Sequence, residues 1–156
     1  MMPLAQAIGE KTLVLLELAP RKGISLETGE KVYIGEGKRD KVYYILGRLK
    51  REKLTESAKQ HLESAMGQIV KDREKEFVEF FNKATAINKR IHQIELLPGM
   101  GKRYAKEIIE EREKGDFESF EDIKKRIKNL PFPEKAIEKR IVLELTEMQR
   151  HNLFTR

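Results

Sequence analysis

Residues 96–108 of this sequence read Leu96-Leu97-Pro98-Gly99-Met100-Gly101-Lys102-Arg103-Tyr104-Ala105-Lys106-Glu107-Ile108. Two glycines enclose one apolar residue, and glycine adopts positive φ angles and lets another surface approach closely. The segment therefore predicts a tight turn between two helices. We expect the Met100 side chain to fill the junction of these helices, and Ala105 is small where they must cross.

The helices on either side of this turn are predicted at 91–97 and 102–112. The second helix would begin at the turn, so its first backbone N–H groups and the positive end of its dipole would point outward. A backbone phosphate is a natural ligand for this position, and the basic side chains there add charge. The candidate nucleic-acid-binding residues are Pro98, Gly99, Met100, Gly101, Lys102, Arg103 and Lys106.

Residues 91–109 resemble the helix-hairpin-helix motif in their hydrophobic, proline, glycine and alanine positions. That motif grips nucleic-acid backbone without sequence specificity in repair proteins, polymerases and DNA-uptake proteins. The resemblance implies that amides around Gly99, Met100 and Gly101 hold a phosphate. It also implies a candidate monovalent cation at the hairpin carbonyls, and no other cofactor is expected. A tight hairpin used only for packing or dimerisation is the alternative.

The next segment, 115–127, resembles the linker and third helix of tandem helix-hairpin-helix domains. Ser119 is expected to cap that helix, with Asp122 placed for a capping-box contact. A second hairpin is expected at 128–133, where no glycine is present. We therefore expect the second hairpin to be degenerate and structural, followed by a last helix from Glu134 to about Thr146.

A β-rich half precedes these helices. Apolar and β-branched patterns predict strands at 11–18, 31–35 and 42–49, and their short connections predict an antiparallel meander. The segment Gly35-Glu36-Gly37-Lys38 is not a phosphate-binding P-loop, which needs four residues between its glycines and Ser or Thr after the lysine. It predicts a hairpin turn instead.

The middle of the chain is predicted to be helical. Thr55 is the expected N-cap of its first helix, and Gly67 is expected to break or kink that helix. Three phenylalanines at 77, 80 and 81 share one helical stripe. We expect them to be buried in the core rather than to stack on nucleic-acid bases.

Over its whole length the sequence resembles an archaeal family of uncharacterised proteins predicted to bind nucleic acid, chiefly RNA. Members pair an OB-like β-domain with a C-terminal helix-hairpin-helix domain. The stretches that carry the resemblance are 3–6, 32–35, 77–82, 95–101 and 117–123. The expected fold class is α+β, with a small antiparallel OB-like sheet and an all-helical tandem helix-hairpin-helix domain. Because an OB barrel needs five strands and three are predicted, we expect an incomplete barrel or a shortened chain.

The resemblance divides the chain into an OB-like β-domain at 1–53, connecting helices at 54–89 and a helix-hairpin-helix domain at 90–156. The chain has 32 Lys and Arg against 26 Asp and Glu, a net charge of +6. Residues 1–53 carry a net +4, whereas residues 92–156 carry only +1. The basic excess indicates either a groove that follows phosphates or a solvated basic loop.

Tyrosines of the β-half are candidates for stacking on bases if it works as an OB surface. Tyr43 and Tyr44 are adjacent in a predicted strand and would point to opposite faces, so at most one is expected in the core. The candidate auxiliary nucleic-acid contacts are Tyr33, Lys38, Arg39, Lys41, Tyr43, Arg48, Lys50 and Arg51.

Composition excludes several other classes of protein. The chain has no cysteine, which excludes disulfides, thiolate zinc sites and cysteine nucleophiles. No Asp, Glu or His cluster has metal-ligand spacing, so neither a metal site nor a nuclease is predicted. A glycosylase would need a shielded carboxylate downstream of the hairpin, and the acidic residues there form a charge-balanced run. No apolar stretch reaches the roughly 18–20 residues of a membrane span, and we expect a cytoplasmic protein.

The sequence therefore predicts a non-enzymatic protein that grips the phosphate backbone of DNA or RNA through the hairpin, with a lean to RNA. A hairpin grip reads neither bases nor the 2′-hydroxyl, so it does not separate the two nucleic acids. The alternative is an interaction module within a ribosomal, transcription or repair complex. A DNA-repair enzyme is the third hypothesis.

Overall fold

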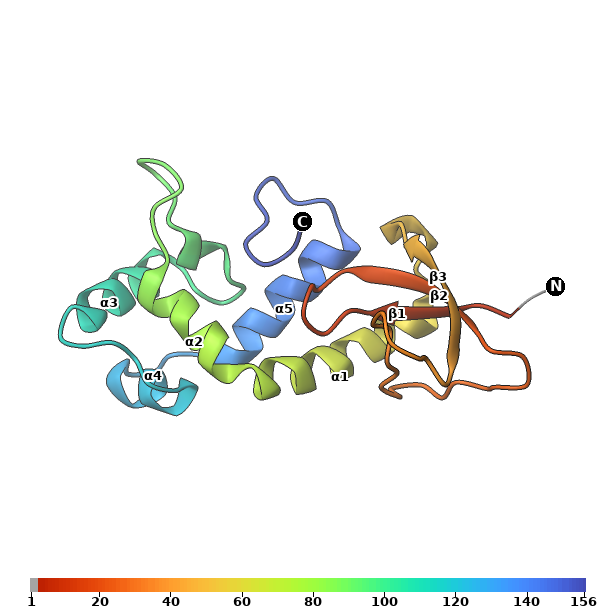
Figure 1. The fold of residues 1–156 in the computed structure, drawn as a ribbon. Helices are drawn as coiled ribbons and strands as arrows, with labels where there is room; N and C mark the ends of the chain where they lie inside the picture. The colour runs from red at the N-terminus through yellow and green to blue at the C-terminus, as the bar shows by residue number, and fades with distance from the viewer. Residues whose placement is uncertain (1–2) are drawn as a thin grey trace. The chain divides into compact units, whose positions relative to one another are not determined.

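A computed structural model describes residues 3–156, which form one antiparallel sheet and five α-helices (Figure 1). The elements are β1 (Ala5–Ile8), β2 (Leu15–Pro20), β3 (Val42–Arg48), η1 (Arg51–Lys53), α1 (Glu56–Asp72), α2 (Glu74–Lys83), η2 (Gln93–Leu96), α3 (Lys102–Arg112), α4 (Phe120–Arg126) and α5 (Pro133–Thr146). Within the described residues the sheet is open and has the strand order β1-β2-β3. The α+β class is confirmed at this level, and the OB-like barrel stays a prediction.

Contacts within the chain divide it into two compact units, which we describe separately. Unit 1 comprises the described residues up to Ala65 together with Leu143–Arg156, and unit 2 comprises Met66–Val142. Unit 1 contains the sheet, and unit 2 contains α2, η2, α3 and α4. The domain boundaries predicted at residues 53 and 89 stay predictions. Residues 1 and 2 of the predicted β-domain lie outside the described part of the chain.

The central strand of the sheet in unit 1 is β2. It pairs antiparallel with β1, from Ala5 opposite Leu18 to Ile8 opposite Leu15, and antiparallel with β3 on its other edge. Leu15 and Leu18 are buried, as the apolar run predicted. The antiparallel arrangement is therefore confirmed, although the strands differ in part from the predicted ones.

The connection between β1 and β2 occupies the residues that were predicted to begin a strand at 11–18. The Gly9 N–H donates to the Val14 carbonyl, and the Leu13 N–H donates to the Gly9 carbonyl, each at 2.9 Å. Leu13 has a φ of 55°, in the left-handed region. The strand therefore starts at Leu15. The preceding strand β1 was missed because Ala-Gln-Ala-Ile has little intrinsic β preference.

No strand forms at 31–35, which corrects that prediction. The Tyr33 hydroxyl accepts a hydrogen bond from the Gly37 N–H at 3.1 Å, and Nε of Arg39 donates to the Gly35 carbonyl at 2.8 Å. The segment therefore closes on itself as a loop. Its alternating apolar pattern was real, but pairing depends on a neighbouring strand as well as on propensity.

Two register shifts between β2 and β3 leave Tyr43 and Leu46 without an opposite residue. Extra residues of this kind are β-bulges, which bend a strand and increase its twist. Tyr43, Tyr44 and Leu46 are all exposed. Neither tyrosine lies in the core, which agrees with the expectation that at most one would.

The helix α1 continues past Gly67, so the predicted break there is wrong, while the alternative of a kink stays a prediction. A Cβ added to Gly67 would lie 3.2 Å from Oε1 of Glu138, so the Glu138 side chain of α5 reaches this point of α1. Met66 and Val70 of α1 are fully buried one turn apart. Burial of this face offsets the roughly 1 kcal/mol that glycine costs in a helix interior.

Two predicted helix caps are present. Oγ1 of Thr55 accepts the N–H of Ala58 at 3.1 Å, and Oγ of Ser119 accepts the N–H of Asp122 at 2.9 Å. The Asp122 carboxylate accepts the N–H of Glu118 at 3.0 Å, one residue before the position that a capping box uses. The helix α4 therefore begins where the sequence predicted.

The phenylalanine stripe of α2 lies in the core of unit 2. Phe77 and Phe81 are buried, while Phe80 is half-buried with its ring edge-to-face against Phe81 at 5.7 Å between centroids. Asn82 exchanges two hydrogen bonds with the backbone of Phe117, at 2.7 and 3.0 Å. The end of α2 is thereby joined to the segment that precedes α4.

The segment after α5 is anchored within unit 1 by Glu144, whose side chain is almost wholly buried. Its carboxylate accepts the backbone N–H groups of Leu153, Phe154 and Thr155 at 2.8, 3.1 and 3.0 Å. It also accepts the Thr155 hydroxyl at 2.9 Å. The chain after α5 therefore folds back onto the end of that helix.

Among residues 3–156, no group of His, Asp or Glu side chains is arranged to hold a metal ion. In the same residues, none of the helices combines the length and the apolar character needed to cross a membrane.

Candidate nucleic-acid interface

The element before the turn, η2, is a single 3-10 turn rather than the predicted helix at 91–97. Nδ1 of His92 accepts the N–H of Ile94 at 3.1 Å, and Oε2 of Glu95 accepts the N–H of His92 at 2.8 Å. This reciprocal pair is a capping box. The turn ends early because Pro98 restricts Leu97 to extended backbone, with φ −73° and ψ 130°.

The turn itself has the geometry that its two glycines predicted. Gly99 has a φ of 83°, in the left-handed region. The Met100 N–H donates to the Leu97 carbonyl at 3.0 Å, and the Met100 side chain is buried. Gly101 is the N-cap of α3, with φ −93° and ψ −172°. Met100 therefore fills the junction, while both glycines are exposed to solvent.

The N-terminus of α3 has no side-chain cap and no acidic residue in its first turn. Every other helix and 3-10 turn of the described chain carries at least one Asp or Glu there. The N–H groups of Lys102, Arg103 and Tyr104 have no acceptor within residues 3–156. An acidic group or a cap normally stabilises this end of a helix. The first turn of α3 is thus left open to an anion from outside.

The basic residues of this first turn differ in what they contact. Nζ of Lys102 donates to the Arg90 carbonyl at 2.6 Å and to Oε1 of Glu95 at 2.9 Å. Its ammonium therefore braces the preceding loop. The Arg103 side chain is 82% exposed and reaches Glu107 at 3.6 Å. Such an exposed pair is weak, which leaves the Arg103 guanidinium available to a ligand.

Lys102 and His92 both influence titration at this site. Hydrogen bonds from the Lys102 ammonium and from the His92 backbone hold the pKa of the Glu95 carboxyl below its usual value of 4.5. Burial, assisted by the charge of Arg112, lowers the pKa of the His92 imidazole below 6.5. A carboxylate and a neutral imidazole are therefore the forms that the folded site favours.

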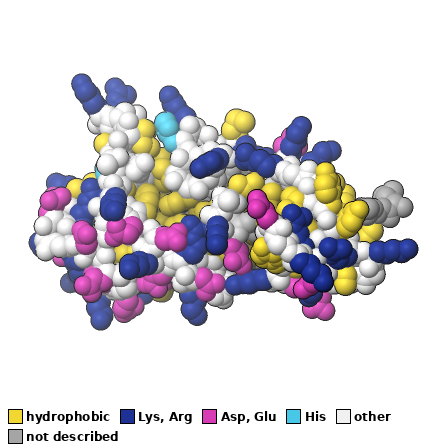
Figure 2. Space-filling view, viewed as in Figure 1, with side chains coloured by type: hydrophobic (Ala, Val, Ile, Leu, Met, Phe, Trp, Pro, Cys, Tyr) yellow, Lys and Arg dark blue, Asp and Glu magenta, His cyan; other side chains and the backbone are white. Residues whose placement is uncertain are grey.

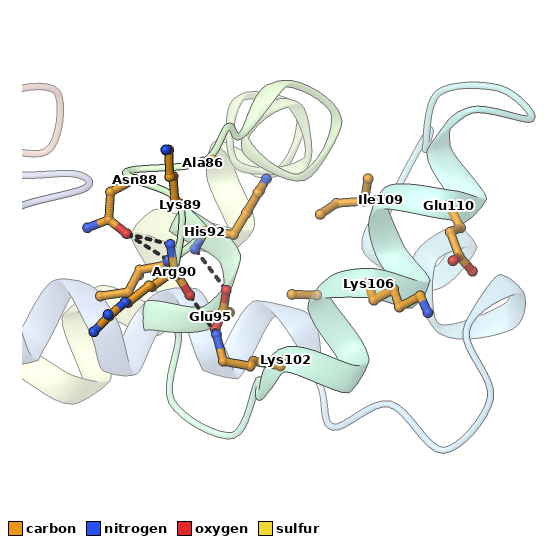
Figure 3. A pocket seen from close by; sticks show the side chains of 12 residues that line it. Ala86, Asn88, Lys89, Arg90, His92, Glu95, Lys102, Lys106, Ile109 and Glu110 are labelled. Atoms are coloured by element: carbon orange, nitrogen blue, oxygen red, sulfur yellow. Dashed lines mark hydrogen bonds and ion pairs between the residues drawn. The ribbon is translucent and has the colours of Figure 1, made fainter.

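A cavity of about 440 Å³ lies between α3 and the loop that follows α2 (Figure 3). The loop is ordered by Asn88, whose Oδ1 accepts the N–H groups of Arg90 and Ile91 at 2.8 and 2.9 Å. Figure 2 shows Lys and Arg side chains gathered at the tip of this loop. The Lys102 ammonium contacts both the loop and η2, through a hydrogen bond to the Arg90 carbonyl and an ion pair with Glu95 (Figure 3).

The second turn, 128–133, forms without glycine. Asn129 adopts a φ of 64°, because asparagine tolerates the left-handed region better than most residues. The Tyr104 hydroxyl donates to the Asn129 carbonyl at 2.7 Å. A Cβ on Gly99 would lie 3.8 Å from Pro131. The second turn thus supports the first, while its role towards a ligand stays a prediction.

The auxiliary residues predicted in the β-half belong to unit 1, and several are engaged within it. Lys41 forms an ion pair with Glu30. Nη2 of Arg48 donates to the Arg156 carbonyl at 2.9 Å, and Nη2 of Arg51 donates to the Glu144 carbonyl at 3.3 Å. Arg39 binds the loop backbone, as described above. Within residues 3–156, the exposed members whose side chains contact no partner are Lys38, Tyr43 and Lys50.

Comparison with known proteins places this fold in a family. The family model described as "Protein of unknown function (DUF655)" matches residues 1–156. The chain belongs to the DUF655 family. It is 42% identical over 153 residues to the uncharacterized protein MJ0038 of Methanocaldococcus jannaschii, covering 97% of this chain and 69% of that protein.

The crystal structure of the DUF655 protein Af1531 from Archaeoglobus fulgidus is similar over 99% of this chain and 86% of that one. The sequence identity is 47% and the TM-score is 0.89. The family resemblance predicted from the sequence is therefore confirmed at the level of an archaeal family. Its OB-like and helix-hairpin-helix parts and its binding of nucleic acid stay proposals for this DUF655 chain.

Sequence reasoning missed the residues that build the loop before η2 in this DUF655 member. Asn88, His92 and Glu95 order that loop through the hydrogen bonds described above. A usable signal was present, because asparagine favours turns in which its side chain bonds the backbone two residues on. The ion pair of Lys102 with Glu95, in contrast, depends on how η2 packs against α3, and no local sequence pattern indicates it.

Proposed function

We propose that this protein binds the phosphate backbone of nucleic acid at the turn 98–101 and the first turn of α3. In this proposal the segment 91–109 works as the helix-hairpin-helix that its sequence resembles. The amides around Gly99 and Gly101 and the first N–H groups of α3 donate to phosphate oxygens. Binding is independent of sequence because these donors contact no base.

One observation carries the proposal, namely that α3 is the helix whose first turn lacks both a cap and an acidic residue. Lys102 and Arg103 stand there instead, and Lys106 follows one turn later. Cations at a helix N-terminus are unfavourable by about 0.3–1 kcal/mol each. A bound phosphate supplies the missing hydrogen-bond acceptor. Its negative charge also attracts both the basic side chains and the positive end of the helix dipole. The arrangement is therefore costly without an anion and favourable with one.

The surroundings of this turn support the same function. Open space surrounds Gly101, where a Cβ would meet no atom within 4 Å. Buried Met100 fixes the turn from below, so the amides are held in place before a ligand arrives. Little conformational freedom is then lost on binding.

Equilibrium binding measured by fluorescence anisotropy tests the proposal. Labelled RNA and DNA, each as duplex and as single strand, are titrated at 50 and 200 mM salt. Binding through phosphates predicts affinity that falls with salt, because each neutralised phosphate releases a counterion. Arg103→Ala should weaken binding to every sequence alike and reduce the salt slope by about one. Lys125→Ala, which removes an exposed charge from α4, is the matched control.

Affinity that does not change with salt, or no binding to any of the four nucleic acids, would contradict the proposal. RNA bound more tightly than DNA of the same form would support the lean to RNA, and the reverse would correct it. Contacts of the sheet are the natural source of such a difference, because the hairpin contacts only the backbone.

A second candidate function is assembly with a protein partner. It is favoured by the exposed Tyr43, Tyr44 and Leu46 on β3, which is an edge strand of the described sheet. Isolation of one protein partner that stays bound at high salt without nucleic acid would favour this function over the first.

A further inference from the structure

The cavity between α3 and the loop after α2 presents positive charge on its rim. Lys89, Arg90 and Lys106 are among its lining residues, and the charged groups of these side chains have no partner within residues 3–156. Glu110 is the acidic lining residue outside the Lys102–Glu95 ion pair. The rim therefore carries a net charge of about +2 and favours an anion.

Apolar side chains form part of the cavity wall. Ile91 of the loop and Ala105 and Ile109 of α3 line it. Ala105 and Ile109 lie one helical turn apart, so they share a face of α3. A cavity of about 440 Å³ falls within the usual ~300–1,000 Å³ of small-molecule sites. Its lining thus combines basic residues with apolar ones.

His92 adds a directional donor to this lining. Its Nδ1 accepts the Ile94 N–H, so the neutral ring carries its proton on Nε2. That N–H has no acceptor within the described residues. Asn88 likewise uses its Oδ1 for the loop backbone, which leaves its amide N–H₂ to donate. These groups suit the acceptor atoms of a planar heterocycle.

We propose that this cavity holds one nucleotide, with its phosphate on the cationic rim and its base against the Ile91–Ile109 wall. This inference rests on the proposed function, because the nucleotide in the cavity is an unpaired nucleotide of the bound RNA or DNA strand. A free mononucleotide has the same chemistry and is the other source.

An unpaired unit of the chain fits the position of the cavity. Lys102 begins α3 and also lines the cavity, and Lys106 follows one turn later. One turn of helix is about 5.4 Å. A strand whose phosphate lies at the first turn of α3 therefore brings its neighbouring nucleotide to the cavity. A base inside a duplex is stacked between its neighbours and cannot enter.

Three RNAs of equal length test this inference by fluorescence anisotropy in the same salt. One is a full duplex, one is that duplex with a single unpaired nucleotide, and one is a single strand. The wild-type protein should bind the RNA with the unpaired nucleotide about tenfold more tightly than the full duplex, which is about 1.4 kcal/mol. In the variant Lys89→Ala/Ile109→Gln the ratio of these two affinities should fall to about one.

Two controls keep the readout specific. Lys125→Ala removes one exposed charge outside the cavity lining and should leave the ratio at its wild-type value. Lys89→Ala alone changes an exposed side chain and should fold normally while lowering the ratio. A full duplex bound as tightly as the RNA with the unpaired nucleotide, or a ratio unchanged in both cavity variants, would overturn the inference.

An NMR titration with adenosine 5′-monophosphate separates the cavity from the hairpin. Shifts of the Ile91 and Ile109 methyl signals with no binding of any RNA would support the nucleotide cavity and contradict the proposed function. Binding of duplex RNA without preference for the unpaired nucleotide, and without methyl shifts, would leave the proposed function standing and overturn the cavity. If no RNA binds and no methyl signal shifts, both the proposed function and the nucleotide cavity are overturned.

Discussion

Gly99 and Asn129 both have positive φ angles in the two turns of unit 2, 83° and 64°. An ordinary side chain in the left-handed region costs roughly 1–2 kcal/mol, and asparagine is tolerated better. The residue after each of them, Met100 or Leu130, is buried. Each turn therefore combines a residue of positive φ with a buried apolar residue after it, once with glycine and once with asparagine.

Substitution of Gly99 tests this reading at the level of one residue. Gly99→Ala should lower the free energy of unfolding by about 1–2 kcal/mol, because the φ angle is strained, although the added Cβ would make only an ordinary contact with Pro131. Gly99→Asn should cost clearly less. Urea unfolding followed by circular dichroism measures both, and equal losses for the two variants would contradict the reading.

Much of the turn could be predicted from these residues alone. Two glycines around an apolar residue indicated the turn, and α3 occupies Lys102–Arg112, the range that was predicted. The positive φ of Asn129 could not be predicted in the same way, because asparagine also adopts negative φ angles. The ion pair of Lys102 with Glu95 was missed since it depends on the packing of η2 against α3.

At the scale of elements, η2 and α3 are joined by a small electrostatic network. Glu95 accepts the His92 N–H from within η2 and the Lys102 ammonium from α3. Ile94, Leu97 and Met100 are buried at the same junction. These apolar side chains exclude water from one side of the network. The network therefore joins η2 to the first turn of α3.

Acid should weaken this junction. The pKa of Glu95 is lowered in the fold, chiefly by Lys102, so its contribution to stability is complete above the usual value of 4.5. That contribution is lost as the pH falls through the lower folded-state pKa. The neutral form of His92 is favoured in the fold, so its contribution is complete above pH 6.5 and declines below it.

The variant Glu95→Gln isolates the first of these effects. It should be less stable than wild type at pH 7, and the difference should shrink as the pH falls below about 4.5. Thermal unfolding followed between pH 3 and 7 measures this. A difference that stays constant over the whole range would show that Glu95 acts through packing rather than through its charge.

Elements were predicted with unequal success for physical reasons. The break at Gly67 was wrong because tertiary packing of the neighbouring Met66 and Val70 compensates the low helix propensity of glycine. The strand at 31–35 was wrong because Tyr33 and Arg39 bond within their own loop. Ser119, in contrast, was read correctly because a cap acts on its own helix.

At the scale of the whole molecule, segments distant in sequence complete each unit. In unit 1 the described residues up to Ala65 are joined by Leu143–Arg156, and Glu144 holds the last residues through three backbone N–H groups. No local pattern at 147–156 predicted this arrangement. A buried carboxylate that accepts four hydrogen bonds is recognisable only once the chain has folded.

Glu144→Ala should therefore destabilise unit 1. Hydrogen bonds to a charged group contribute about 1.5–3 kcal/mol when their loss leaves partners unsatisfied. Amide hydrogen exchange should show lost protection at Leu153, Phe154 and Thr155. Glu147→Ala, at an exposed position just after α5, should change stability by less than about 0.5 kcal/mol. Unchanged exchange at the three amides would contradict this assignment.

The central claim is that the open first turn of α3 receives a phosphate, and Gly101→Asp tests it most directly. Gly101 already has the extended backbone of an N-cap, and open space surrounds it. An aspartate there should cap α3 and occupy the anion position at once. Gly101→Asn, which caps without charge, is the matched control.

The account predicts that Gly101→Asp raises the free energy of unfolding by about 0.5–1 kcal/mol. In the anisotropy titration the same variant should bind RNA and DNA at least about tenfold more weakly, and Gly101→Asn should lie between it and wild type. A loss of binding with a gain in stability cannot arise from unfolding. A stabilised Gly101→Asp variant that binds nucleic acid as tightly as wild type would contradict the claim.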